Sequence, residues 1–240
     1  MSLWSRIAAV LSSLAAGEGL SAIFDRLRTS SETHGPEKSV GFTIAVIALG
    51  AKMAKADGTV TRAEVSAFRQ VFTLADEDAD DAARVFNLAR QDVAGFDAYA
   101  RKAAALFRPE GVPLCADDRN VLIDLLEGLF HIAMADGSYH PAEDAYLAQV
   151  AGIFGLDDRC FRALRARFVD GAPRDPHDVL GIAPGATLAE ARAAWKQAVR
   201  DSHPDAMIAR GIPAEAVQLA TRRLIAINAA WEDLQNRRAA

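Results

Sequence analysis

The tripeptide His203-Pro204-Asp205 gathers polar groups that could serve in binding or in acid–base chemistry. The imidazole of His203 offers both a donor and an acceptor nitrogen, and the carboxylate of Asp205 can pair bidentately with an arginine. Pro204 stiffens the backbone between them. A catalytic His–Asp dyad is not favoured, because neither a nucleophile nor a metal-ligating set accompanies these residues. We therefore interpret the tripeptide as a binding surface and expect the protein not to be an enzyme.

Four carboxylates form a second group with regular spacing. At an offset of 79 residues, residues 54–58 align with residues 133–137, and both segments end in Asp-Gly. A glutamate follows seven residues later in each copy, which gives Asp57 with Glu64 and Asp136 with Glu143. The two copies have the pattern of one repeated unit, which is an apolar helix, a short turn and a second amphipathic helix.

These carboxylates have two interpretations that the sequence leaves open. In the first, the glycine after each aspartate ends a helix, and each glutamate meets the positive start of the next one, Glu64 as part of a capping box. In the second, the four carboxylates converge on a hard cation such as calcium or magnesium. The spacing is not that of an EF-hand loop, and capping explains all four residues without a ligand.

Hydrophobic periodicity predicts an all-α fold for the elements that carry these residues. In the second copy apolar residues recur at helical spacing, namely Leu122, Leu125, Leu126, Leu129 and Ile132. Loop-forming residues mark the boundaries between helical regions. We expect an N-terminal helix (1–28), a linker (29–39), a helical bundle with the internal repeat (40–168), a second linker (169–175) and a small antiparallel helical domain (176–240).

The first 28 residues contain an apolar stretch whose role the sequence does not fix. Its uninterrupted part is about ten residues long, whereas a membrane span needs about twenty. Glu18 also places a carboxylate near the middle of the stretch, which opposes a span. An interfacial or partner-facing helix is the favoured interpretation, ahead of a core helix and a true span. We expect the protein to be soluble or peripherally bound to a membrane.

Two helices are expected to flank the tripeptide and expose it. Thr187 and Glu190 form the capping box that opens the first helix, and Pro204 disfavours helical geometry at the residue before it, which ends that helix. The second helix repeats apolar residues at spacings of three and four, namely Val217, Ala220, Leu224, Ile227, Trp231 and Leu234. On the outward face of the first helix, a four-residue spacing gives a basic stripe of Arg192, Lys196 and Arg200.

The composition excludes several classes of protein. Of the 240 residues 51% are hydrophobic and 25% charged, which describes a folded globular chain. The net charge of −5 argues against a nucleic-acid partner, because phosphate binding needs a clustered basic excess. Cys115 and Cys160 stand apart without a CxxC motif, so we expect two buried, reduced thiols in a cytosolic protein and no zinc site.

Together these motifs resemble the DjlA family of co-chaperones. The run Asp178 to Ile182, the capped helix with Trp195, the His-Pro-Asp tripeptide and the run Ile227 to Trp231 have the order and spacing of a DnaJ-family J domain. The Ala-Asp-Gly turns followed by glutamates are similar to those of the TerB tellurite-resistance family. A TerB-like domain before a J domain is the arrangement of DjlA.

This resemblance implies a co-chaperone, without a cofactor, that docks on a DnaK-type chaperone and stimulates its ATP hydrolysis. His203, Pro204 and Asp205 carry that role in the family, and the basic stripe would meet an acidic partner surface. The TerB-like domain would give localisation or bind an unidentified client. The expected location is the cytoplasm, with an association at the cytoplasmic face of the inner membrane through residues 1–28 as a further option. The alternatives are a metal sensor using the four carboxylates and a chaperone-recruiting adaptor with little ATPase stimulation.

The sequence departs from the usual J-domain pattern beside the tripeptide. Asp201 and Ser202 stand where the family has basic and aromatic residues, and Ala193 and Gln197 stand where lysine or arginine is common. These departures predict a weaker contact with the chaperone.

Overall fold

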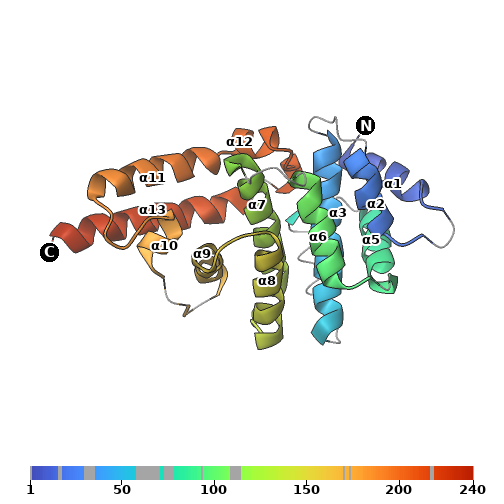
Figure 1. Cartoon of the computed structure of the whole chain (residues 1–240), viewed down its shortest axis with the longest axis horizontal. Helices are drawn as coiled ribbons and strands as arrows, with labels where there is room; N and C mark the ends of the chain where they lie inside the picture. Colours follow the sequence, from blue (N-terminus) through green and yellow to red (C-terminus); the bar gives the residue numbers. More distant parts are fainter. Residues whose placement is uncertain are drawn as a thin grey trace.

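Helices make up all the regular structure among the described residues of the computed structural model, which are 2–15, 18–29, 36–57, 71–72, 78–92, 94–108, 115–169, 171–172, 174–216 and 219–239 (Figure 1). The all-α prediction is confirmed. The elements are α1 (Leu3–Ser12), α2 (Ser21–Thr29), α3 (Pro36–Asp57), α5 (Ala79–Gln91), α6 (Phe96–Phe107), α7 (Ala116–Ala133), α8 (Pro141–Ile153), α9 (Asp158–Phe168), α10 (Pro176–Leu180), α11 (Leu188–Asp201), α12 (Pro204–Ala209), the 3₁₀ helix η2 (Ala214–Ala216) and α13 (Leu219–Ala239).

Helix α3 is the centre of the larger of two hydrophobic cores. Every residue from Val40 to Met53 is buried, as expected of a helix that is apolar on all sides. Other helices must therefore surround it, and α5, α6, α7 and α8 pack against it together with α1 and α2. Figure 1 shows α3 between α7 and α8 on one side and α1, α2 and α5 on the other. It begins at Pro36, inside the segment that the sequence assigned to a linker.

The N-terminal residues differ from the single interfacial helix that the sequence favoured. They form two helices, α1 and α2, and their apolar side chains are buried in the larger core, namely Trp4, Ile7, Leu11, Leu20, Ile23, Phe24 and Leu27. Glu18 lies between the two helices, where its carboxylate accepts a hydrogen bond from the backbone N–H of Ala15 at 2.8 Å and pairs with Arg26. In the part of the chain that the structure describes, no helix is both long enough and apolar enough to cross a membrane.

A smaller core lies between α10, α11 and α13. Helices α11 and α13 run antiparallel, as the sequence predicted (Figure 1). The buried residues of this core are Leu180, Ala191, Ile227, Ala230 and Leu234. Trp195 and Trp231 stack with ring centroids 5.5 Å apart, and the Trp195 indole N–H donates to the side-chain oxygen of Asn228 at 2.9 Å. This polar contact satisfies the indole group while its ring packs between the helices.

The segment between α11 and α13 belongs to the larger core. Its buried apolar residues Met207, Ile212 and Ala216 pack with the bundle, as do Leu219 and Ala220 at the start of α13. Helix α13 begins at Leu219. The small unit formed by α10, α11 and α13 is therefore held to the bundle by packing contacts as well as by the covalent chain.

The two cysteines are free, and one of them lies elsewhere than expected. Cys160 is half-buried in α9, and burial raises the pKa of its thiol. Cys115, predicted to be buried, is exposed at the start of α7, where its sulfur accepts a hydrogen bond from the backbone N–H of Asp118. Its position as the N-cap of a helix accounts for that exposure.

Candidate functional site

Helix α11 leads directly into the His-Pro-Asp tripeptide. At its start, the Thr187 backbone N–H donates to the Glu190 carboxylate at 2.7 Å, and the Glu190 N–H donates to the Thr187 hydroxyl at 3.2 Å. This reciprocal capping satisfies two of the free N–H groups of the first turn. At its end, Ser202 is buried and its hydroxyl donates to the Ala198 carbonyl at 2.7 Å. The helix therefore has fixed ends, and its last turn fixes where the tripeptide begins.

The tripeptide itself opens the short helix α12. His203 has the extended backbone expected before a proline and is the N-cap, while Pro204 takes the first helical position. The backbone N–H of Asp205 donates to Nδ1 of His203 at 3.2 Å. Because Nδ1 accepts this bond, the proton of the neutral imidazole is assigned to Nε2. The His203 and Asp205 side chains are 62% and 88% exposed, so both remain accessible to a partner.

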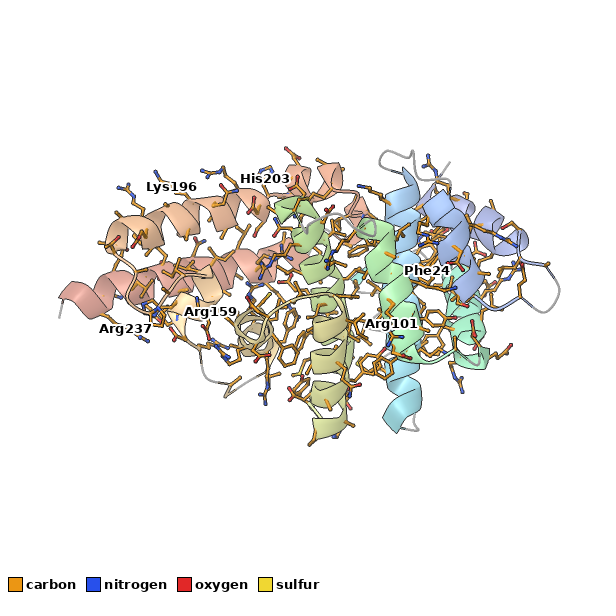
Figure 2. All side chains as sticks on the ribbon, in the orientation of Figure 1. Phe24, Arg101, Arg159, Lys196, His203 and Arg237 are labelled. Carbon is orange, nitrogen blue, oxygen red and sulfur yellow. The ribbon has the colours of Figure 1, made fainter. Side chains whose placement is uncertain are left out.

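The basic stripe lies on the same exposed side of the molecule. Arg192, Lys196 and Arg200 are all exposed on α11. Figure 2 shows Lys196 and His203 on the side of α11 that faces away from α13. Gln197 connects the end of the stripe to the last residue of α11, since its amide N–H donates to Asp201 at 2.8 Å and its oxygen accepts from Arg200. Of the six residues singled out for partner binding, the three basic residues, His203 and Asp205 are exposed, and Pro204 is half-buried.

The four repeat carboxylates fall partly outside the described residues. Asp57 is the last residue of α3, but its side chain and all of Glu64 lie outside them. In the second copy, Asp136 accepts a hydrogen bond from the Ser138 N–H at 2.8 Å, and Glu143 accepts one from the His140 N–H at 2.8 Å. The second bond is the helix-start contact of the capping interpretation. Over the described ranges, no three His, Cys, Asp or Glu side chains are grouped to hold a metal ion.

A buried ionic cluster joins the bundle to the small unit, and the sequence analysis missed it. Asp124 and Glu127 of α7 are 0% and 1% exposed. Arg223 of α13 donates through Nε to both Glu127 oxygens at 3.0 and 3.1 Å and also pairs with Asp124. Arg167 of α9 pairs with Glu127, and Arg210 lies with Nη2 3.4 Å from Asp124. The signal in the sequence was two acids, three residues apart, within an apolar helix.

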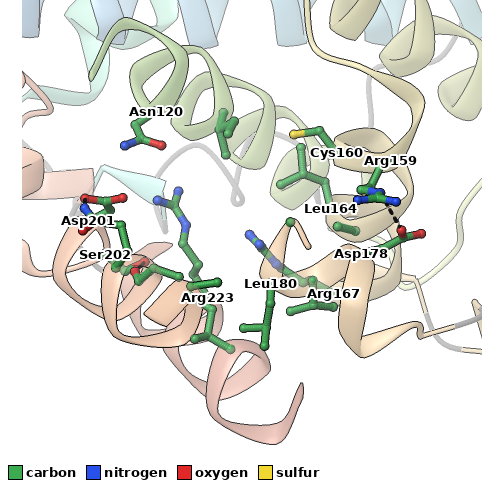
Figure 3. Close-up of a pocket in the computed structure, with 18 of the residues that line it drawn as sticks. Asn120, Arg159, Cys160, Leu164, Arg167, Asp178, Leu180, Asp201, Ser202 and Arg223 are labelled. Carbon is green, nitrogen blue, oxygen red and sulfur yellow. Dashed lines mark hydrogen bonds and ion pairs between the residues drawn. The ribbon is translucent and has the colours of Figure 1, made fainter. Parts of the chain in front are cut away.

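The electrostatics of this ionic cluster depend on its burial. Burial raises the pKa of Asp124, a shift that Arg223 and Arg210 oppose. Burial alone would lower the pKa of Arg223, but Asp124 and Glu127 outweigh it and hold that pKa above its usual range. Arg223 is therefore charged at every physiological pH. A cavity of about 500 Å³ lies beside the cluster between α7, α9, α11 and α13, and Figure 3 shows Arg167 and Arg223 lining it.

Comparisons with known proteins agree with the motifs. The family model of the tellurite resistance protein TerB matches residues 43–166. Co-chaperone protein DjlA of Photobacterium profundum is 27% identical, covering 85% of this chain and 80% of its own. The DjlA co-chaperone of Coxiella burnetii is 27% identical, and the match covers 76% of this chain and 72% of the relative. The DjlA co-chaperone of Escherichia coli K12 is 24% identical, and the match covers 97% of each chain.

The similarity of the chain to TerB and DjlA proteins is thus established by sequence comparison. No solved structure gives a significant match. The TerB match spans α3 to α9, which form most of the bundle, and the DjlA matches extend across most of the chain. Because the family model covers more than half of the 240 residues, the chain belongs to the TerB family, as a DjlA-like member of it.

Proposed function

We propose that the protein is a co-chaperone that docks on a DnaK-type chaperone and stimulates its ATP hydrolysis. The observation that carries this proposal is the exposed His-Pro-Asp tripeptide at the end of a helix whose outer face is basic. The names of its relatives, co-chaperone protein DjlA, support the same role. ATP hydrolysis would take place in the chaperone, so this chain acts as a regulator and not as an enzyme.

The exposed groups match the chemistry of such a docking event. Nε2 of His203 presents a donor to solvent. The exposed Asp205 carboxylate, one oxygen of which lies 3.6 Å from His203 Nδ1, could take a bidentate bond from a partner's arginine. The stripe of Arg192, Lys196 and Arg200 would attract an acidic surface and speed the encounter. Each contact can form without unfolding the small unit, because none of these side chains contributes to its core.

The bundle would supply localisation or client binding. A peripheral membrane contact through residues 1–28 would use the outer faces of α1 and α2, where Leu3 and Val10 are only partly buried, since the larger apolar side chains such as Trp4 and Phe24 are buried in the core. The cation interpretation of the repeat carboxylates gains no support from Asp136 and Glu143, since a neighbouring backbone N–H binds each of them. A second alternative is an adaptor that docks on the chaperone with little effect on ATP hydrolysis.

Single-turnover ATP hydrolysis by a DnaK-type chaperone, with and without the protein, tests the proposal. The wild-type chain should accelerate hydrolysis, and His203→Gln should abolish the acceleration while leaving the helical circular dichroism unchanged. Stability should change by no more than about 0.5 kcal/mol, because the side chain is exposed. His140→Gln is the matched control on the bundle, where the histidine is also exposed, and should behave as wild type.

Two results would contradict the proposal. Full stimulation by His203→Gln would show that the tripeptide does not couple docking to hydrolysis. Docking of the wild-type chain without any stimulation would favour the adaptor.

A further inference from the structure

The segment that follows the tripeptide is anchored to the bundle by apolar and polar contacts. Met207 and Ile212 are 0% and 1% exposed in the larger core. The Ser39 hydroxyl of α3 donates to the Gly211 carbonyl at 2.9 Å. Gly211 has φ of +91°, and a Cβ built there would lie 2.6 Å from Cβ of Lys38, so the close approach of the backbone to α3 requires glycine. The bundle thus fixes the C-terminal end of the loop that carries the tripeptide, residues 201–210.

Arg210 connects both ends of that loop to the bundle. Its side chain is 6% exposed. Nη2 donates to the carbonyl of Asp201, two residues before the tripeptide, at 2.9 Å, and the same nitrogen lies 3.4 Å from Asp124 of α7. One guanidinium therefore closes the loop 201–210 on itself and holds it against the bundle. The tripeptide projects from this closed loop into solvent.

The charges of the ionic cluster show that Arg210 is its surplus member. The described cluster holds three arginines, Arg167, Arg210 and Arg223, against two carboxylates, Asp124 and Glu127. Removing Arg210 leaves equal numbers of buried positive and negative charges, whereas removing a carboxylate leaves an uncompensated buried charge. Arg223 also makes several bonds to Glu127, whereas Arg210 has one contact with Asp124 and one with the loop. The feature that distinguishes Arg210 is its bond across the loop.

We propose that Arg210, held by Asp124, is a positioning residue that keeps the His-Pro-Asp loop in the conformation that docks on the chaperone. The bundle thereby sets how readily the small unit engages its partner. The inference rests on the proposed function and names a residue that acts through the loop without touching the chaperone. If the docking conformation is only partly populated, the apparent dissociation constant rises in inverse proportion to that population, while the bound complex is unchanged.

The test is a titration of ATPase stimulation with Arg210→Met, which keeps the apolar stem of the side chain and removes its guanidinium group. We expect the protein concentration for half-maximal stimulation to rise at least five-fold, with the maximal stimulation unchanged. Arg222→Met is the matched control, because it removes the same charge from an exposed position on α13 outside the loop and should leave both quantities unchanged. His203→Gln, in contrast, should abolish the maximal stimulation.

Hydrogen exchange supplies a second measurement that does not involve the chaperone. In Arg210→Met, peptides that cover residues 201–211 should exchange faster, while peptides from the first turns of α11 should not change. If Arg210→Met melts globally at the assay temperature, Ser39→Ala, which removes the bond to the Gly211 carbonyl at the other end of the loop, should still raise the half-maximal concentration and speed exchange of residues 201–211.

Several results would overturn the positioning role. One such result is an Arg210→Met protein with the same half-maximal concentration for ATPase stimulation and the same hydrogen exchange as wild type. A reduced maximal stimulation at an unchanged half-maximal concentration would instead indicate that Arg210 contacts the chaperone directly. If the wild-type chain fails to stimulate hydrolysis, the proposed function fails, and the exchange measurement alone then decides whether Arg210 holds the loop.

Discussion

At the scale of single residues, the bundle buries polar groups whose protonation is coupled to folding. His131 of α7 is the clearest example, since its Nδ1 is buried and has no hydrogen-bond partner among the described residues. Burial, with a smaller contribution from the nearby Arg222, lowers the pKa of this imidazole to about 4. The folded state therefore keeps His131 neutral under conditions in which an unfolded histidine, with a pKa near 6.5, would bind a proton.

The sign of the resulting pH dependence follows from that lowered pKa. The contribution of His131 to stability is fully present above pH 6.5 and is lost as the pH falls toward 4, because the unfolded state then binds the proton. At pH 5 the loss should be on the order of 1 kcal/mol, after a reduction for partial exposure of the ring. Urea unfolding at pH 7.5 and pH 5 measures this loss, and the free energy of unfolding of His131→Leu should fall less between the two pH values than that of wild type. An equal drop in both proteins would assign the effect to other groups, and His140→Leu serves as the exposed control.

At the scale of helices, what the sequence could predict depended on whether the determinants were local. The start of α11 follows from Thr187 and Glu190 and its end from Pro204, because capping and proline geometry act within a few residues. The burial of α1 and α2 could not be inferred, since an apolar run does not specify whether it packs against a membrane, a partner or its own core. The ionic cluster was equally hidden, because Asp124 and Arg223 come from helices far apart in the chain.

The basic face of α11 should act through long-range attraction, in contrast to the tripeptide. Arg192→Ala and Lys196→Ala should each raise the concentration for half-maximal stimulation several-fold at low salt, with the maximum recovered at higher protein concentration. The difference from wild type should shrink in about 0.5 M salt, because exposed charges are screened there. Arg237→Ala is the charge-matched control, since Arg237 lies on the side of the small unit opposite Lys196 (Figure 2). A salt-independent loss would mean that these side chains make close contacts instead.

At the scale of the whole molecule, α13 and the preceding segment couple two cores that the sequence analysis placed in separate domains. Met207, Ile212, Ala216, Leu219 and Ala220 pack in the larger core, and α13 then continues into the smaller one. The ionic cluster crosses the same boundary. A segment shared by two cores favours cooperative unfolding, because the smaller core cannot keep its geometry after α13 loses its first turns.

This coupling can be tested with the three tryptophans of the chain, because they report on different cores. Trp4 lies in the larger core, whereas Trp195 and Trp231 stack in the smaller one, so fluorescence of Trp4→Phe reports on the small unit alone. In that background Met207→Ala should lower the free energy of unfolding by about 2–4 kcal/mol through loss of buried methylene groups. Tryptophan fluorescence and circular dichroism should shift together in urea. Ile225→Ala, at a side chain in α13 that is 65% exposed, should change stability by less than about 0.5 kcal/mol. Separate transitions, with the fluorescence midpoint unmoved by Met207→Ala, would show that the small unit folds independently of the bundle.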